Sequence, residues 1–297
     1  MSESFQVDIE KARELATGRI DQLDSDLNTK VNKVLHANPE LFYKEFIAHD
    51  TLSSYLENLG FFVPRSCHGL ETSFEATIGE GGRQVVFCCE YDALPGIGHG
   101  CGHNLIATSS VAAFLGAAHA MAELKIPGRL RILGTPAEEN GGGKAVLIDN
   151  GAFSPAEDIA AAIMAHPFAE NAMTTAEGTC SGAAALTLLA CHKFRSEFWG
   201  KPAHAAAEPW NGVNALDAAV ATYNNIAVLR QQISPDERLG VVIKDGGDVP
   251  NIIPAYSSMD WSVRAPTFKR SERFYEKVKK CIEAGALATG CTHKITE

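Results

Sequence analysis

Three short segments of this chain carry residue types that bind metal ions. The first is Glu90-Tyr91-Asp92, followed by a glycine-rich loop that holds Cys101 and His103. Thiolate, imidazole and carboxylate are the ligands that zinc prefers in proteins. A Cys and a His separated by one residue converge on an ion only where the backbone turns sharply, which the glycines of this loop permit. A thiolate also has enough lone pairs to bridge two ions.

The other two segments supply two adjacent acids and another imidazole. Glu138 and Glu139 end the segment Thr-Pro-Ala-Glu-Glu at 135–139, and His166 follows the apolar stretch 160–165. Adjacent acids are costly to bury without a partner, and one natural division of labour is a metal ligand beside a general base. Alone, each segment has an ordinary explanation: a buried thiol, a solvated acidic loop, a structural histidine. Their joint occurrence after separate predicted strands favours one shared metal site.

The elements that must position these residues alternate between strands and helices. The apolar patterns predict helices at 7–36, 45–59, 104–123 and 142–150, and strands at 73–78, 84–90, 129–135 and 160–165. The strands at 84–90 and 160–165 are apolar without alternation, which predicts burial on both faces. This order is typical of an α/β domain with a mostly parallel sheet. Catalytic groups gather at the carboxyl ends of such strands.

The pattern changes after about residue 178. We predict a strand at 183–193, a helix at 212–232, strands at 239–244 and 256–263, a helix at 268–288 and a strand at 293–296. This βαββαβ order predicts a small α+β domain. The chain therefore reads as two domains, 1–178 and 179–297.

The composition predicts a globular protein and makes some kinds of partner unfavourable. The 297 residues are 45% hydrophobic and 21% charged, with a formal charge of −10, a globular mix whose acidity disfavours nucleic acid as a partner. Residues 1–14 carry no apolar signal segment, and we expect the apolar run at 111–121 to be too short to span a membrane. Eight scattered cysteines show neither a disulfide framework nor a C-x-x-C pair. We therefore expect a cytoplasmic protein with no membrane partner.

Five motifs occur in one order: EYDALPGIGHGCGHN at 90–104, TPAEE, His166, GKPAHA at 200–205 and NIIP at 251–254. Together they resemble metallopeptidase family twenty, and most closely its amidohydrolase branch of aminoacylases, auxin-conjugate amidohydrolases and β-alanyl-lysine-type dipeptidases. The resemblance implies a di-metal catalytic domain with an inserted α+β domain that serves as lid and dimerisation domain. It also implies metal-dependent hydrolysis of the amide bond in a dipeptide or N-acyl amino acid.

The resemblance also implies roles in the first domain. Glu138 matches the general base that activates water, and Asp92 matches the acid that supports a metal ligand from behind. The implied cofactors are two divalent ions, zinc in the first place, with manganese or cobalt as substitutes. The positions that match metal ligands are Cys101, His103, Glu139 and His166.

Three matches lie in the second domain. His204 matches a histidine that stabilises the oxyanion, often across a dimer interface, which implies a homodimer formed through the lid domain. Asn251 and Arg264 match substrate contacts, with Arg264 a candidate partner for a substrate carboxylate. Without the resemblance, the His and the Arg would be ordinary surface residues.

One departure from the family leaves two alternatives open. Family members return from the inserted domain to the catalytic domain and gain a further histidine ligand there, which has no counterpart after His204. We therefore expect an incomplete catalytic domain. One alternative is a catalytically impaired or non-catalytic binding or regulatory protein of the same fold. Another is a thiol hydrolase with Cys101 as nucleophile and a nearby His as base, in which the two adjacent acids have no obvious role.

Overall fold

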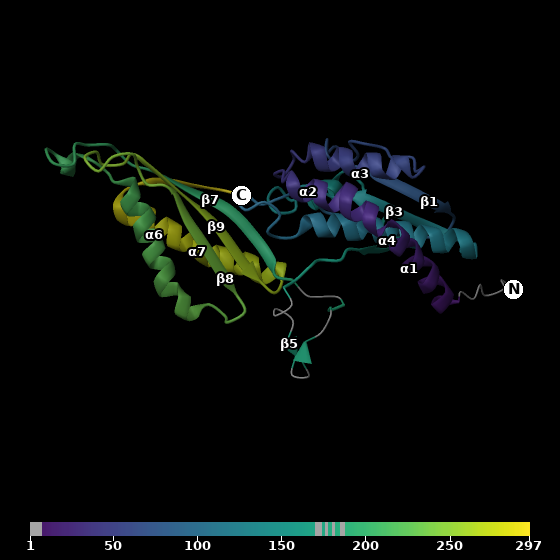
Figure 1. Ribbon diagram of the computed structural model, residues 1–297. Coiled ribbons are helices and arrows are strands. Elements are labelled where there is room, and N and C mark those ends of the chain that lie inside the picture. The colour runs from purple at the N-terminus through teal and green to yellow at the C-terminus, as the bar shows by residue number, and fades with distance from the viewer. Residues whose placement is uncertain (1–7, 170–173, 176–177, 180–181, 185–187) are drawn as a thin grey trace. The chain divides into compact units, whose positions relative to one another are not determined.

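A computed structural model describes residues 8–169, 174–175, 178–179, 182–184 and 188–297. The chain divides into two compact units, Met1–Ser181 and Gly182–Glu297 (Figure 1). Each has its own hydrophobic core.

The first unit is built on a four-stranded sheet in the order β1-β3-β2-β4. Strand β2 (Gln84–Cys89) runs parallel to both β3 (Gly128–Gly134) and β4 (Ile159–Ile163), and β1 (Glu75–Glu80) runs antiparallel to β3. The predicted α/β class with a mostly parallel sheet is therefore confirmed. Because β2, β3 and β4 run in one direction, their carboxyl ends lie along one edge of the sheet.

Helices of this unit pack around the sheet and around one another (Figure 1). Helix α4 (His103–Leu124) contacts both α1 (Ile9–Asp26) and β2, and the core contains side chains from all three elements. The predicted first helix continues from α1 through a π-helical segment, Leu27–Asn32, into α2 (Lys33–Ala37). The remaining elements of this unit are α3 (Phe46–Asn58), α5 (Gly143–Asp149), a 3-10 turn (Ala156–Asp158) and the two-residue strands β5 (Thr174–Thr175) and β6 (Gly178–Thr179).

Strand β4 differs from its prediction. Its apolar run predicts burial on both faces, but most of its residues are exposed, including Ile163 at 46%. Among the described residues β4 is an edge strand that pairs only with β2. An apolar pattern reports the environment that side chains favour, whereas burial also requires neighbouring atoms to cover them.

Helix α4 corrects the expectation that the apolar run at 111–121 is too short to span a membrane. The apolar run at 111–121 belongs to a helix of 22 residues, which is long and apolar enough to cross a membrane by length and composition. Half of its most apolar window is buried in the unit, where α4 packs against α1 and the sheet. This packing is how the core helix of a globular unit behaves.

The second unit is a four-stranded antiparallel sheet, in the order β10-β7-β9-β8, with two helices. The βαββαβ order is as predicted, although the first strand, predicted at 183–193, is observed at Ala190–Trp199, and residues 185–187 lie outside the described chain. The core includes Met259, Trp261 and Val263 of β9, so the alternate residues of this strand lie on the other face of the sheet. The elements are β7 (Ala190–Trp199), α6 (Ala215–Leu229), β8 (Arg238–Asp245), β9 (Tyr256–Ala265), α7 (Phe268–Thr289) and β10 (Thr292–Thr296), with 3-10 turns at Pro209–Asn211 and Arg230–Gln232.

Candidate metal centre

The parallel strands deliver the predicted site residues to one edge of the first unit. Asp92 follows β2, Glu138 and Glu139 follow β3, and His166 follows β4. Gly102, at φ +82°, forms the N-cap of α4 between Cys101 and His103. A Cβ at Gly102 would lie 2.7 Å from Pro167 Cγ, so this close turn requires glycine.

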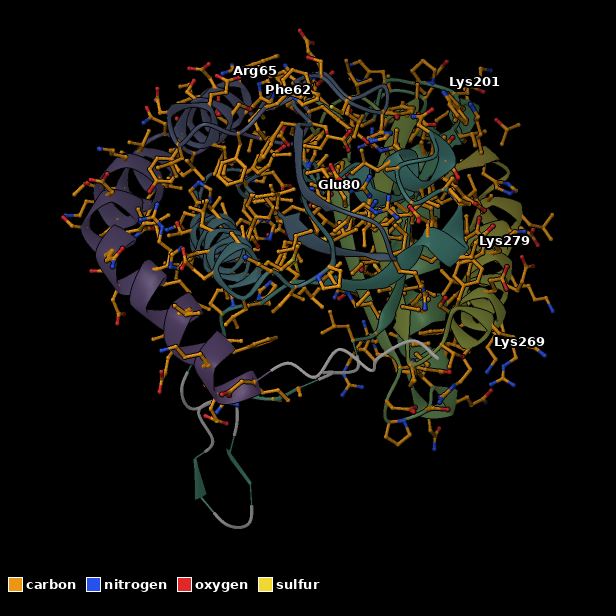
Figure 2. The ribbon with its side chains drawn as sticks, turned by 90° about the vertical axis from the view of Figure 1, so that its right-hand side faces the viewer. Phe62, Arg65, Glu80, Lys201, Lys269 and Lys279 are labelled. Carbon is orange, nitrogen blue, oxygen red and sulfur yellow. The ribbon has the colours of Figure 1, made fainter. Side chains whose placement is uncertain are left out.

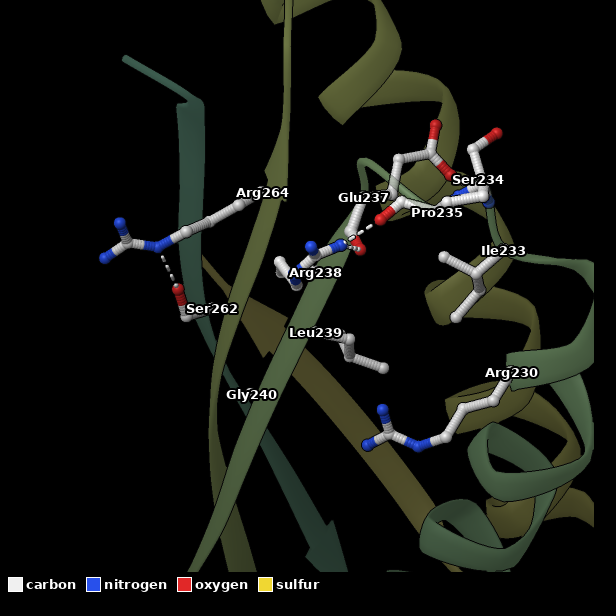
Figure 3. Close-up of a pocket in the computed structure, with 10 residues that line it drawn as sticks. All are labelled: Arg230, Ile233, Ser234, Pro235, Glu237, Arg238, Leu239, Gly240, Ser262 and Arg264. Carbon is white, nitrogen blue, oxygen red and sulfur yellow. Dashed lines mark hydrogen bonds between the residues drawn. The ribbon is translucent and has the colours of Figure 1, made fainter. Parts of the chain in front are cut away.

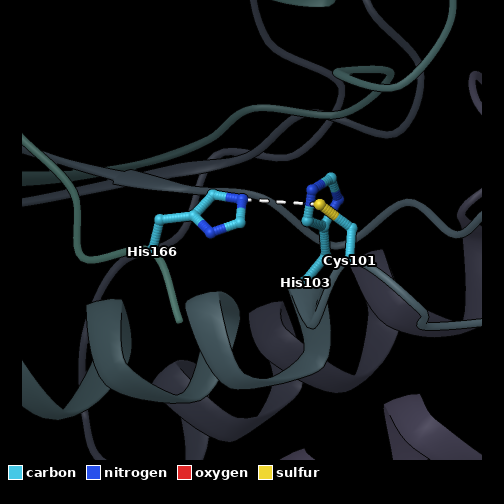
Figure 4. Close-up of side chains that lie close together, drawn as sticks. All are labelled: Cys101, His103 and His166. Carbon is cyan, nitrogen blue, oxygen red and sulfur yellow. Dashed lines mark hydrogen bonds between the residues drawn. The ribbon is translucent and has the colours of Figure 1, made fainter. Parts of the chain in front are cut away.

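The four residues that match metal ligands lie together, and Figure 4 shows three of them, Cys101, His103 and His166. The ligand atoms of Cys101, His103 and His166 are all within 4.8 Å of one another. Cys101 Sγ is 3.4 Å from His166 Nε2. Glu139 hydrogen-bonds to Cys101, and its Oε1 is 3.8 Å from His103 Nε2. Residues far apart in sequence thus present sulfur, nitrogen and oxygen donors to one centre.

Hydrogen bonds orient both imidazoles with Nε2 toward this centre. His166 Nδ1 donates to the carbonyl oxygen of Pro167 at 2.8 Å. His103 Nδ1 donates to Asp92 Oδ1 at 3.0 Å, and Asp92 Oδ2 accepts the backbone N–H of Glu139 at 2.9 Å. A ligating histidine usually makes such a bond through its other nitrogen.

The buried His103–Asp92 pair shifts the pKa of both groups. Burial would raise the pKa of Asp92, but the hydrogen bonds from His103 and from the Glu139 backbone lower it overall. Burial would likewise lower the pKa of His103, but its bond to Asp92 and the nearby carboxylates raise it. Both shifts favour the charged forms and keep Asp92 an acceptor.

Glu90 and Lys144 also belong to the centre, although sequence reasoning gave them no role. His103 Nε2 is 3.5 Å from Glu90 Oε2 and 3.7 Å from Glu138 Oε2. Lys144, in α5, forms an ion pair with the other oxygen of Glu90. The acid could have been noticed, because it precedes Asp92 by two residues at the end of a buried strand. The lysine could not, because only the path of the chain after Glu139 brings it there.

This donor set fits a divalent cation. His103 Nε2 and Glu90 Oε2 are buried without a hydrogen-bond partner. Burial and the surrounding carboxylates, first among them Glu139, raise the pKa of Cys101 to about 12. A bound cation would compensate the buried negative charge and hold the thiol as thiolate. Nitrogen, sulfur and carboxylate oxygen are together the ligands of zinc.

In the second unit the structure brings His204 and Asn251 together. The backbone N–H of Ala205 donates to the carbonyl oxygen of Asn251 at 3.0 Å, and His204 bridges to Ile252. His204 Nδ1 accepts the backbone N–H groups of Ala206 and Ala207, both at 3.2 Å. Its hydrogen is therefore on Nε2, which leaves an exposed N–H able to donate to an oxyanion.

Arg264 lies at the other end of β9. It lines a pocket of about 520 Å³ with Arg230 and Arg238 (Figure 3). Arg264 and Tyr256 are eight positions apart on this extended strand, about 26 Å at the usual rise of ~3.3 Å per residue. The second unit of a single chain therefore does not bring Arg264 together with Asn251 and His204.

Comparison with known proteins places this arrangement in a family. Residues 86–294 match the model of peptidase family M20/M25/M40. The chain belongs to peptidase family M20. It is 42% identical, over 97% of its length, to a mouse protein named Xaa-Arg dipeptidase, and 30% identical, over 91%, to one of the subunits of p-aminobenzoyl-glutamate hydrolase from Escherichia coli. These alignments span 66% and 57% of the two relatives.

Solved structures show the same fold. The M20 chain superposes on an aminobenzoyl-glutamate utilization protein from Klebsiella pneumoniae with a TM-score of 0.67 at 17% identity, covering 95% of this chain and 77% of the other. A dinuclear metal-binding M20 peptidase from Bacillus subtilis gives a TM-score of 0.61 at 18% identity, covering 93% and 74%. The family match confirms the membership that the motifs implied, and these structures confirm the fold.

Proposed function

We propose that this chain carries the metal centre of an M20 amidohydrolase that cleaves the amide bond of a dipeptide or an N-acyl amino acid. One observation carries the proposal: Cys101, His103, Glu139 and His166 present their donor atoms to a single centre, with Glu138 beside it. Two divalent ions bound there, zinc first, would acidify a water molecule and polarise the substrate carbonyl.

The two adjacent acids have different environments, which supports different roles. The side chain of Glu139 is 16% exposed and hydrogen-bonds to Cys101, while its backbone N–H donates to Asp92, as suits a ligand. The side chain of Glu138 is 43% exposed and lies 3.7 Å from His103 Nε2. A water molecule and a substrate can reach Glu138, so it suits the base that removes a proton from water and then delivers it to the leaving amine.

The thiol-hydrolase alternative has less support. The raised pKa of Cys101 disfavours the free thiolate that would act as nucleophile. His166 Nε2 lies 3.4 Å from the sulfur, which suits a base, but Glu139 also hydrogen-bonds to this thiol. A carboxylate at that position opposes thiolate formation unless a cation is present.

We further propose that the functional unit is a homodimer formed through the second unit. Strand β8 is an edge of its sheet, and exposed apolar side chains lie on β8 (Val242) and α6 (Val220, Tyr223, Val228). By the family resemblance, His204 of one copy in such a dimer would stabilise the oxyanion at the site of the other. That arrangement suits the separation of His204 from Arg264 along one chain.

Metal content and hydrolysis test the proposal together. Purified chain reconstituted with zinc should retain about two ions by mass spectrometry, as di-metal hydrolases do. It should hydrolyse at least one member of a panel made of dipeptides that end in arginine, N-acetyl amino acids and p-aminobenzoyl-glutamate. The dipeptides and p-aminobenzoyl-glutamate follow the names of the two relatives, and the N-acetyl amino acids follow the family resemblance. Folded chain that retains no zinc would favour the non-catalytic alternative instead.

A further inference from the structure

A buried carboxylate outside the metal centre holds the loop that carries Glu138 and Glu139. Glu45 immediately precedes α3 and is fully buried, at 0% exposure. Its Oε1 accepts the backbone N–H of Ala137 at 2.9 Å and that of Tyr43 at 3.0 Å. Its Oε2 accepts the hydroxyl of Thr72 at 2.8 Å. Glu45 thus joins three segments that are distant in sequence.

Both backbone donors on Oε1 belong to residues with left-handed backbone. Tyr43 has φ +60° and Ala137 has φ +59°. Residues with a Cβ seldom adopt this conformation, and it persists only where the surroundings hold it. One carboxylate oxygen therefore stabilises two strained residues at once, and Ala137 directly precedes the two acids of the metal centre.

A second contact holds the far end of the same loop. Tyr43 Oη donates to the carbonyl oxygen of Gly141 at 2.6 Å. A Cβ on Gly141, at φ +126°, would lie 2.5 Å from Tyr43 Cε2. Within the loop, the N–H of Gly143 donates to the carbonyl oxygen of Ala137 at 3.0 Å. Residues 137–143 are thus held by Glu45 at the beginning and by Tyr43 near the end.

We propose that Glu45 is a positioning residue for the metal centre: by accepting the N–H of Ala137, it fixes the backbone from which Glu138 and Glu139 project. Both carboxylate oxygens of Glu45 accept hydrogen bonds from Tyr43, Ala137 and Thr72, none of which is a predicted metal ligand. Its role rests on the proposed function only in so far as Glu139 binds metal. The acceptor matters because the left-handed conformation of Ala137 would otherwise relax and turn both acids away.

A matched set of variants separates positioning from general stability. Glu45→Ala removes the acceptor. Glu45→Gln keeps an oxygen for Tyr43 and Ala137 and can donate its amide to the Thr72 hydroxyl. Glu40→Ala is the control, because the Glu40 carboxylate accepts the N–H groups of Ile47 and Ala48 at the start of α3 and has no hydrogen bond to the loop. Ala137→Gly tests the strain, because glycine adopts positive φ without steric cost.

Two readouts are used, neither of which requires turnover. Cobalt(II) affinity is measured by visible absorption, and hydrogen exchange of the amides of 138–141 is measured by mass spectrometry on the metal-free chain. Glu45→Ala should weaken cobalt binding and accelerate exchange, each by about tenfold or more. Glu45→Gln and Glu40→Ala should stay within about threefold of the parent chain for both. Adding Ala137→Gly to Glu45→Ala should recover a measurable part of the cobalt affinity, a non-additive effect expected of coupled sites.

Opposite results overturn the proposal. A folded Glu45→Ala variant with unchanged exchange and cobalt affinity would exclude positioning, and so would the absence of any recovery by Ala137→Gly. If Glu45→Ala does not fold, Glu45→Asp takes its place, because its shorter side chain cannot reach both N–H groups. If the parent chain binds no cobalt, the proposed function fails, and the exchange of 138–141 in the metal-free chain still decides whether Glu45 holds the loop.

Discussion

His103 donates from Nδ1 to Asp92 at 3.0 Å, in a pair whose side chains are both fully buried. The second oxygen of Asp92 accepts the backbone N–H of Glu139. One carboxylate therefore sets the ring orientation of one predicted ligand and the backbone position of another. Asp92 holds His103 and Glu139 by direct hydrogen bonds. Its contribution to metal binding can therefore be measured separately from that of the ligands.

Replacing Asp92 with Asn should weaken zinc binding by about 10- to 100-fold. Asparagine offers only one acceptor oxygen, so its NH2 group would face either His103 Nδ1–H or the N–H of Glu139. Zinc affinity is measured by competition with a chromogenic chelator. The same substitution at Asp24, an exposed residue of α1, is the control. Equal affinities in the two variants would show that Asp92 does not support the ligands.

Replacing Glu138 with Gln should leave zinc content unchanged and lower kcat by about 10²- to 10⁴-fold, the usual contribution of a general base. Glu139→Gln should instead lower zinc content, because this side chain lies among the donor atoms. Both variants are compared by metal analysis and by initial rates on the substrate that the panel identifies. Full activity of Glu138→Gln would exclude its role as base.

Chelator-treated chain should be inactive, and its Cys101 should react slowly with iodoacetamide. With a pKa of about 12 the thiol carries little thiolate at pH 7.5, so we expect alkylation at least about tenfold slower than at the exposed Cys191. Peptide mass spectrometry follows both sites in one sample. Rapid alkylation of Cys101, together with activity that survives chelation, would favour the thiol hydrolase.

His49 should make the stability of the first unit depend on pH. Burial and the nearby Arg65, which is labelled in Figure 2, lower the pKa of His49 below its ordinary value of 6.5. At pH values between the folded and the unfolded pKa of His49, the unfolded chain binds more protons than the folded chain. The free energy of unfolding therefore decreases as the pH falls below 6.5. The slope from this group is at most about 1.4 kcal/mol per pH unit.

The matching measurement is urea unfolding of metal-free parent and His49→Asn chains between pH 5 and 7. Asparagine removes the titrating group and retains a polar side chain of similar size. The variant should lose less stability than the parent as pH falls across this range. Parallel pH profiles for the two chains would contradict the prediction.

The proposed dimer predicts an effect of charge on α6. Val228→Glu should shift the chain from dimer toward monomer in light scattering, because a desolvated, unpaired carboxylate at an interface is costly. Leu287→Glu on α7 is the matched control, since Leu287 is also highly exposed, at 85% against 74% for Val228. A parent chain that is monomeric at high concentration would contradict the dimer itself.

Much of this structure was predictable from local patterns. The apolar runs before Glu90 and Thr135 identify two strands, and the alternation with helices predicts the parallel sheet that aligns their ends. Because parallel strands end on one edge, Asp92, Glu138 and His166 could be expected near one another before any coordinates. Cys101 and His103, which are separated by a single glycine, can likewise be found from a short stretch of sequence.

Other features depend on contacts between residues that no short pattern relates. The pairing of Lys144 with Glu90 requires the actual path of the loop into α5, and the bond from Ala137 to Glu45 spans 92 residues. The exposure of β4 shows the same limit, because its apolar run indicated burial that the described neighbours do not provide. Sequence pattern determined which elements form and which chemical groups follow them. The tertiary structure alone decided which buried groups meet, because hydrogen bonds and ion pairs act only over the few ångströms that packing sets.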